Sequence, residues 1–242
     1  MDKHVSIKLK FCLITLLFGF FILSSKLVLA TDYYVAGDTG LDTNSGNSSL
    51  PWKTIQKAAD TVIAGDTVNV KGGISYTGSN SCGSPYTAVI CLTRSGTAES
   101  FISFQSWSGT GIPTINAAGA FFRYGFGVNL SGSGVNYIKI NGFIIKDAYY
   151  GIVGIGIGNI FINNVIYDTA TYTTAGIVTT SESSSSYVYN NTIFNTLIGI
   201  YAGQGQTIAK NNIVLNARYQ GFTISSGMYV VSWNDKLCIG IV

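Results

Sequence analysis

The chain has 242 residues, of which 14 are lysine or arginine, 11 are aspartate or glutamate and one is histidine. Four of the lysines and one aspartate lie in the first 30 residues, so the rest of the chain carries ten residues of each sign and no formal net charge. This balance argues against a nucleic-acid partner, and a composition rich in β-formers and punctuated by 29 glycines argues against a helical bundle.

The first 30 residues have the order of a secretory signal peptide. Lysines precede an apolar run over Phe11–Leu23, and Val28–Ala30 provides small or β-branched residues of the kind found at a signal-peptidase cleavage site. The apolar run is short for a membrane span. We therefore expect a signal peptide at 1–30 and a mature chain at 31–242 that is secreted to the extracellular space or the cell surface, with no membrane contact afterwards. The alternative is a retained N-terminal anchor.

Histidine and cysteine usage narrows the chemistry further. His4 lies in the leader, so the mature chain cannot use a Ser-His-Asp relay, a Cys-His relay or a histidine-based zinc site. Three cysteines remain after the leader, namely Cys82, Cys91 and Cys238. Cys82 and Cys91 flank a short Gly/Pro/Ser segment, which favours a disulfide over two free thiols in an exported protein. Cys238 is left without a partner.

In chain order, the N-terminal region reads as strand, loop, helix and strand. Residues 33–35 predict a strand, and a turn-rich loop follows to residue 49. Residues 54–64 predict a helix, because their apolar residues fall on one helical face: Ile55, Ala58, Ala59, Val62 and Ile63. Strands are predicted again at 66–70, 101–104 and 114–115.

An internal repeat fills residues 135–242. Each copy contains a short strand, an asparagine turn, a second strand, another turn and a third strand that begins with Gly-Ile or Gly-Phe. The corresponding turn residues recur at intervals of 22, 27 and 21 and are Asn141, Asn163, Asn190 and Asn211. Three strands in about 22 residues predict an all-β fold, a right-handed parallel β-helix (solenoid) whose coils stack about 4.8 Å apart. Residues 54–64 would be its one N-terminal capping α-helix, within a cap region at 31–73.

The stacking gives the repeat residues structural roles. We expect the turn asparagines to adopt the left-handed backbone and to form a side-chain ladder between coils. Apolar residues such as Ile162 and Ile193 are predicted to point into the coil.

The opening of the mature chain resembles a known family. Residues 33–46, 51–59 and 65–70 are similar to the N-terminal cap of secreted right-handed parallel β-helix proteins, including pectate lyases. The later copies resemble the general parallel β-helix (PbH1) repeat. The resemblance implies a polysaccharide partner and, in its sharpest form, a calcium-dependent uronate (pectate-type) lyase. In such an enzyme the cation neutralises the uronate carboxylate and a lysine or arginine removes the neighbouring proton.

The sequence gives only indirect evidence for catalytic and metal-binding residues, because it has no stretch that matches the paired-aspartate motif of the pectate lyases. The simplest alignment puts one column after the second strand, formed by Lys146, Asp168, Asn195 and Asn216. Lys146 and Lys139 are the candidate bases, and Asp147 with Asp168 is the candidate calcium pair. The same two aspartates could instead form the carboxylate pair of a glycoside hydrolase. An ordinary surface ion pair is the third interpretation.

Two further features have a binding and a structural interpretation. Asp38, Asp42 and Asn44 form either an oxygen-rich calcium loop or a turn that shapes the loop before the helix. Tyr149, Tyr150 and Tyr172 are candidate sugar contacts, although tyrosine is also a common strand residue.

The competing function is a non-catalytic cell-surface or matrix protein that acts as a structural or adhesive spacer. The last residues, Leu237 to Val242, are apolar and stop within a coil, which predicts an incomplete C-terminus and end-to-end self-association. The alternative is that these residues fold back as their own cap.

Overall fold

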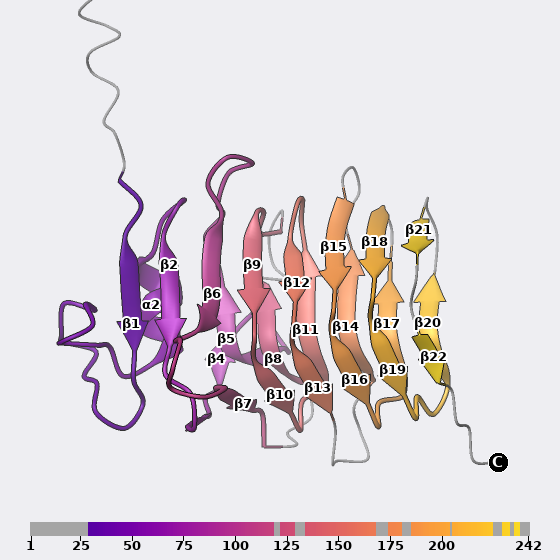
Figure 1. The fold of residues 1–242 in the computed structure, drawn as a ribbon, viewed down its shortest axis with the longest axis horizontal. Coiled ribbons are helices and arrows are strands. Elements are labelled where there is room, and N and C mark those ends of the chain that lie inside the picture. Colours follow the sequence, from indigo (N-terminus) through magenta and orange to yellow (C-terminus); the bar gives the residue numbers. More distant parts are fainter. Residues whose placement is uncertain are drawn as a thin grey trace, which may run out of the picture.

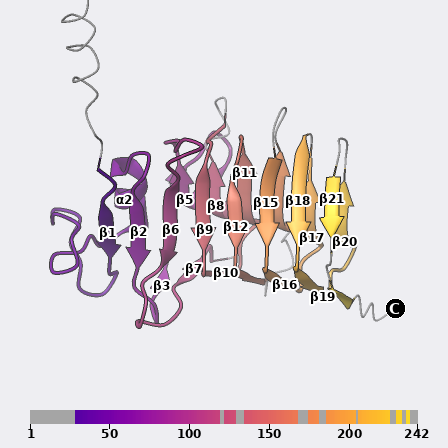
Figure 2. The same ribbon diagram turned by 45° about the horizontal axis from the view of Figure 1, so that its top comes forward.

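The computed structural model is a stack of coils in which each coil adds one strand to each of three sheets (Figures 1 and 2). The coils follow one another along the long axis, from indigo at the N-terminal end to yellow at the C-terminal end. The structure describes residues 29–118, 122–128, 134–167, 174–180, 185–203, 205–224 and, for the backbone, 229–232 and 235–237. The predicted leader, apart from Leu29 and Ala30, and Cys238 lie outside these residues, so the leader and end-to-end association stay predictions.

Each of the three sheets runs along the stack from the N-terminal to the C-terminal coils. Sheet A consists of β1 (Asp32–Val35), β2 (Thr67–Val70), β6 (Ile102–Ser106), β9 (Ile138–Asn141), β12 (Ile160–Ile162), β15 (Ser185–Tyr189), β18 (Gln206–Lys210) and β21 (Tyr229–Ser232). Sheet B consists of β3 (Ser75–Tyr76), β7 (Thr114–Asn116), β10 (Ile144–Lys146), β13 (Val165–Tyr167), β16 (Thr192–Phe194), β19 (Ile213–Leu215) and β22 (Asp235–Leu237). Sheet C consists of β4 (Asn80–Ser81), β5 (Thr87–Leu92), β8 (Arg123–Val128), β11 (Tyr150–Ile155), β14 (Ala175–Thr180), β17 (Ile198–Ala202) and β20 (Gln220–Ile224).

Strand pairing confirms the predicted fold class. Successive coils pair in parallel throughout the three sheets, and β4 with β5 is the one antiparallel pair among the described strands. The chain is therefore an all-β parallel β-helix, with one helix among the residues that the structure describes.

The coil interior is filled by stacked aliphatic and aromatic side chains. One column of sheet B is buried along its length and contains Ile115, Ile145, Ile166, Ile193 and Val214. Each such side chain contributes roughly 1.5–3 kcal/mol by its burial. The prediction for Ile193 is confirmed, but the prediction for Ile162 is wrong, because Phe161 points inward and Ile162 is half-buried on the opposite face. The segment Ile160–Ile162 is apolar at every position, so its pattern does not distinguish the two faces.

The first turn of each coil uses the left-handed backbone, as predicted, with φ values of 57°, 53° and 56° at Asn163, Asn190 and Asn211. The prediction for Asn141 is wrong by one residue. Asn141 pairs with Ile162, and Gly142 takes the left-handed position with φ 79°.

The ladder between coils is formed by the asparagine that follows each left-handed residue, at Asn164, Asn191 and Asn212. These side chains are 0–1% exposed. The backbone N–H and Nδ2 of Asn164 both donate to Oδ1 of Asn191, at 3.0 and 3.1 Å. The same two groups of Asn191 donate to Oδ1 of Asn212 at 3.0 Å. The predicted ladder of turn asparagines is confirmed for one pair, because the exposed Asn163 Nδ2 donates to Oδ1 of Asn141 at 3.0 Å. The buried ladder, which the sequence did not predict, lies one residue further along the chain and inside the coil.

The helix α2 (Ile55–Thr61) lies at the N-terminal end of the stack (Figures 1 and 2). It is shorter than the predicted 54–64 because Val62 is extended and Asp66 accepts a hydrogen bond from the backbone of Ile63 at 2.9 Å. Thr54 is the N-cap, as predicted, and accepts a bond from the N–H of Lys57. Within the described part of the chain, no helix has the length and apolar character that crossing a membrane requires.

The ladder allows a direct test with neighbouring asparagines. Asn191→Ala should lower the free energy of unfolding by about 2–4 kcal/mol, because it removes the acceptor for two buried donors of Asn164. Asn190→Ala should cost only about 1 kcal/mol, for placing alanine in the left-handed region, and Asn190→Gly should be near neutral. Urea unfolding followed by circular dichroism measures all three. A larger loss in Asn190→Ala than in Asn191→Ala would contradict the assignment.

Candidate functional site at the corner between sheets B and C

The strand register changes the predicted catalytic column. Lys146 pairs with Tyr167, and Tyr167 pairs with Phe194, whose ring stacks on it at a centroid distance of 4.9 Å. The prediction that Lys146 shares a column with Asn195 is therefore wrong by one residue. Asp147 holds the left-handed turn position instead, with φ 53°, as Asn195 does with φ 58°. Aspartate tolerates this backbone much as asparagine does, which is why the sequence did not fix the alignment. Asp168, the other member of the predicted pair, lies outside the described residues.

The candidate bases lie on different faces of one coil. Lys139 is on β9, between the buried Ile138 and Ile140, so its side chain projects from the outer face of sheet A. Lys146 ends β10 in sheet B, and its Nζ lies 3.5 Å from Oδ2 of Asp147. The two lysines cannot serve one site. The half-exposed ion pair contributes little to stability, but it holds an amine and a carboxylate together at the corner where sheet B turns into sheet C.

Five aromatic rings form a closed cycle beside this corner, and we call them the aromatic cluster. In the order of the cycle they are Tyr86, Phe122, Tyr149, Tyr150 and Tyr124, which closes back on Tyr86. The centroids of neighbouring rings in this order lie 4.8–5.5 Å apart. Tyr124 is buried and the other four are half-buried. Ring pairs at these distances gain about 0.5–1.5 kcal/mol each beyond their burial. The four tyrosines of the cluster belong to a group of side chains separate from the coil interior.

The fold positions the cluster through pairing and a disulfide. Tyr150 pairs with Tyr124 of the preceding coil, and the backbone of Tyr149 donates to the carbonyl of Arg123 at 2.7 Å. Tyr86 lies in the turn between β4 and β5, which Cys82 and Cys91 close as the disulfide that the sequence favours.

The hydroxyls of Tyr124 and Tyr150 remain protonated at neutral pH. Burial, with smaller effects from the neighbouring tyrosines, raises the pKa of Tyr150 to about 12. Burial likewise raises the pKa of Tyr124 well above its usual range. The rings therefore present neutral groups that can donate hydrogen bonds.

Arg123 adds a second cation to the corner. Its Nη1 donates to the carbonyl of Ala117 at 3.4 Å, and the N–H of Ala117 donates to the carbonyl of Lys146 in the next coil. The Nε of Arg123 is buried and has no hydrogen-bond partner among the described residues. Two cations, a carboxylate and a set of neutral aromatic rings thus meet at one corner of the coil.

Sequence reasoning found part of this arrangement. It singled out Tyr149 and Tyr150, which do lie together, and Tyr172, which lies outside the described residues. It missed Tyr86, Phe122, Arg123 and Tyr124. A usable signal was present, because Tyr124-Gly-Phe126 has the same order as Tyr150-Gly-Ile152 and extends the repeat by one coil.

The acidic loop before the helix has a structural role. Asp42 accepts bonds from the N–H and Oγ1 of Thr54, both at 2.8 Å, and so fixes the start of α2. Asp38 pairs with Lys71 at 2.7 Å, and that bond lowers the pKa of Asp38. Among the described residues, no group of three His, Cys, Asp or Glu side chains could hold a metal ion. The bonds of Asp42 to Thr54 and of Asp38 to Lys71 favour the loop-shaping interpretation over a calcium loop.

The three parallel sheets define a parallel β-helix. Two lyases are among the solved structures that superpose on it. Pectate lyase Pel9A superposes with a TM-score of 0.67 at 19% identity, over 90% of this chain and 59% of its own. A rhamnogalacturonan lyase superposes with a TM-score of 0.50 at 15% identity, over 83% of this chain and 63% of its own. At these identities the similarity shows a shared fold, and this chain spans less than two thirds of either neighbour. The sequence matches no protein-family model and no curated protein.

The raised pKa of Tyr150 predicts a loss of stability in alkali. Below pH ~10 the phenol is neutral in both folded and unfolded chains, and between pH ~10 and the folded pKa of about 12 only the unfolded chain ionises. The contribution of Tyr150 is therefore complete below pH ~10 and is lost as the pH rises through its folded pKa. Tyr150→Phe should flatten the decline in unfolding free energy above pH ~10, measured by urea unfolding at a series of pH values. Tyr219→Phe, at a residue that is 69% exposed, is the control. An equal decline in wild type and Tyr150→Phe would refute the effect.

Proposed function

We propose that this chain binds polysaccharide at the aromatic cluster and the neighbouring cations. The closed cycle of five rings beside Arg123 and Lys146 is the observation that carries the proposal. Aromatic faces pack against the apolar faces of sugar rings, and neutral phenols bond to sugar hydroxyls. Cations at the same corner favour a polysaccharide that carries carboxylates, as uronates do. The fold shared with two proteins named as polysaccharide lyases supports this class of ligand.

The finer form of the proposal is a calcium-dependent uronate lyase. Lys146, once deprotonated and out of its ion pair with Asp147, would take the proton next to the uronate carboxylate. The electron pair of that C–H bond would form the carbon–carbon double bond as the neighbouring glycosidic C–O bond breaks, and the released sugar oxygen would take up a proton. Calcium, when bound, would neutralise the substrate carboxylate. The described residues do not by themselves fit that ion, because Asp147 belongs to no group of three ligands among them. The calcium requirement therefore depends on Asp168 and is proposed from the family resemblance.

The proposal includes export of the protein from the cytosol. The Cys82–Cys91 disulfide supports it, because disulfides persist mainly outside the reducing cytosol. A spacer without sugar affinity is the competing function, and a polysaccharide-binding experiment separates the two.

Binding is tested by variants of two half-buried rings. Tyr149→Ala and Tyr150→Ala should each weaken retardation by polygalacturonate in affinity electrophoresis several-fold, which corresponds to about 1 kcal/mol for one lost ring contact. Tyr149→Phe, which keeps the ring, should bind nearly as wild type does. Tyr187→Ala, on the outer face of sheet A, is the matched control. No retardation of the wild type would favour the spacer, and an effect confined to Tyr187→Ala would move the binding face to sheet A.

Catalysis is tested separately from binding. If the chain is a lyase, Lys146→Ala should abolish the ultraviolet absorbance of unsaturated uronate product, a chelator should do the same, and polymer binding should survive Lys146→Ala in large part. Lys139→Ala should retain activity, because its side chain projects from another sheet. Activity that survives Lys146→Ala and chelation would reject this mechanism.

A further inference from the structure

The N-terminal edges of the three sheets are closed in different ways. In sheet A, the backbone of Trp52 donates to Tyr34 and accepts from Ala36, which covers the outer edge of β1. In sheet C, the side chain of Gln56 donates to the carbonyl of Cys91 at 3.0 Å and accepts from its N–H at 2.8 Å. Gln56 thus acts as a substitute for a neighbouring strand.

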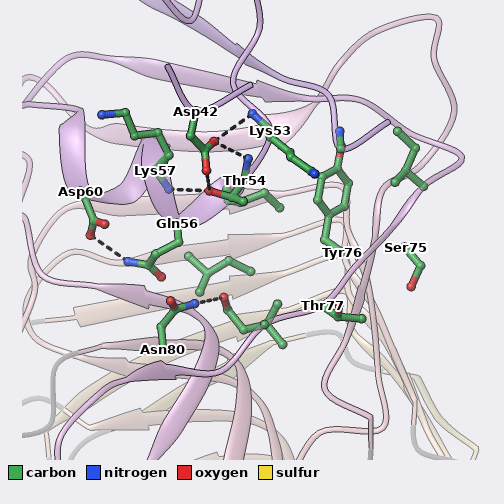
Figure 3. Close-up of a pocket in the computed structure, with 16 residues that line it drawn as sticks. Asp42, Lys53, Thr54, Gln56, Lys57, Asp60, Ser75, Tyr76, Thr77 and Asn80 are labelled. Atoms are coloured by element: carbon green, nitrogen blue, oxygen red, sulfur yellow. Dashed lines mark hydrogen bonds between the residues drawn. The ribbon is translucent and has the colours of Figure 1, made fainter. Parts of the chain in front are cut away.

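Sheet B has no such cover among the described residues. Its first strand, β3, pairs with β7 on one side, and no described residue pairs with its other edge. A pocket of about 490 Å³ lies over that edge, between β3, the start of α2 and β5 (Figure 3). This volume is within the ~300–1,000 Å³ of ordinary small-molecule sites.

The pocket combines an apolar floor with a polar rim. Ile55, Val89 and Ile90 line it and are 0–4% exposed. Ser75 and Thr77 supply hydroxyl groups from the β3 side. A buried apolar surface surrounded by hydroxyl groups and an open strand edge suits a ligand with one apolar face and many hydroxyls, as a sugar ring has.

The charges around the pocket are unequally satisfied. Asp42 accepts two bonds from Thr54, and Asp60 accepts a bond from Gln56 at 2.8 Å. Lys57 lies over the ring of Trp52 at 6.0 Å. Lys53 is exposed and reaches across toward Tyr76 (Figure 3), and its ammonium has no carboxylate within salt-bridge distance among the described residues. The lining therefore carries as many aspartates as lysines, and Lys53 is the lysine whose ammonium is paired with no described carboxylate or ring.

We infer that this pocket is a second saccharide site, which takes one acidic sugar unit. The carboxylate of that unit pairs with Lys53, its hydroxyls bond to Ser75, Thr77 and the open edge of β3, and its apolar face lies on the half-buried Ile74. The inference rests on the proposed function for the class of ligand. The pocket is distinct from the aromatic cluster, because the β4–β5 hairpin presents Asn80 to the pocket and Tyr86 to the cluster.

The test uses digalacturonate as the probe, with isothermal titration calorimetry on the full exported chain. Lys53→Glu should weaken binding at least tenfold by reversing the charge, and Thr77→Tyr should do so by filling the pocket. Lys210→Glu makes the same charge change on an exposed lysine of β18 and should have no effect. Tyr187→Ala, on the outer face of sheet A, should also leave digalacturonate binding within twofold of wild type.

The outcomes separate this inference from the proposed function. Digalacturonate affinity that is unchanged in both Lys53→Glu and Thr77→Tyr overturns the second site, as does a wild type that fails to bind the probe at millimolar concentration. Either result would leave the proposed polymer binding at Tyr149 and Tyr150 unaffected, because that proposal is tested by its own variants. Loss of polymer binding in Lys53→Glu with none in Tyr149→Ala would support the pocket and reject the aromatic cluster.

Discussion

The buried asparagine ladder is the interaction on which the arrangement of the coils depends. In a parallel sheet a shift of one residue moves every side chain to the opposite face, so register has to be fixed at each turn. Asn164, Asn191 and Asn212 fix it, because each side chain binds the backbone of the adjacent coil from inside the stack.

Register also decides what chemistry reaches the surface. The pairing of Tyr124 with Tyr150 stacks rings from two coils, whereas a slip of one residue would bring a glycine against a tyrosine and remove the contact. The same register brings Lys146 next to Ala117 of the preceding coil, whose N–H donates to the carbonyl of Lys146 and whose own carbonyl accepts from Arg123. The corner is thus a product of the repeat, in which side chains distant in sequence become neighbours because their coils are adjacent.

The sequence predicted the fold well because stacking imposes a period that composition and spacing reveal. It predicted the site less well, for two physical reasons. Aspartate and asparagine both tolerate the left-handed turn, so the alignment placed Lys146 where Asp147 belongs. Tyr86 is held against the cluster by the antiparallel β4–β5 hairpin and its disulfide. Both lie outside the repeat, so the periodic pattern of the sequence does not predict the contact of Tyr86 with Tyr124.

The β4–β5 hairpin links the two proposed binding sites. It departs from the solenoid because the first coil has no preceding strand in sheet C, and β4 folds back to cover part of that edge while Gln56 covers the rest. Closing an edge in this way prevents unwanted strand pairing. The turn that results carries Tyr86 outward to the aromatic cluster and leaves Asn80 at the pocket over β3. The β4–β5 hairpin, which covers the end of sheet C, thereby contributes to two proposed binding sites that a uniform solenoid would lack.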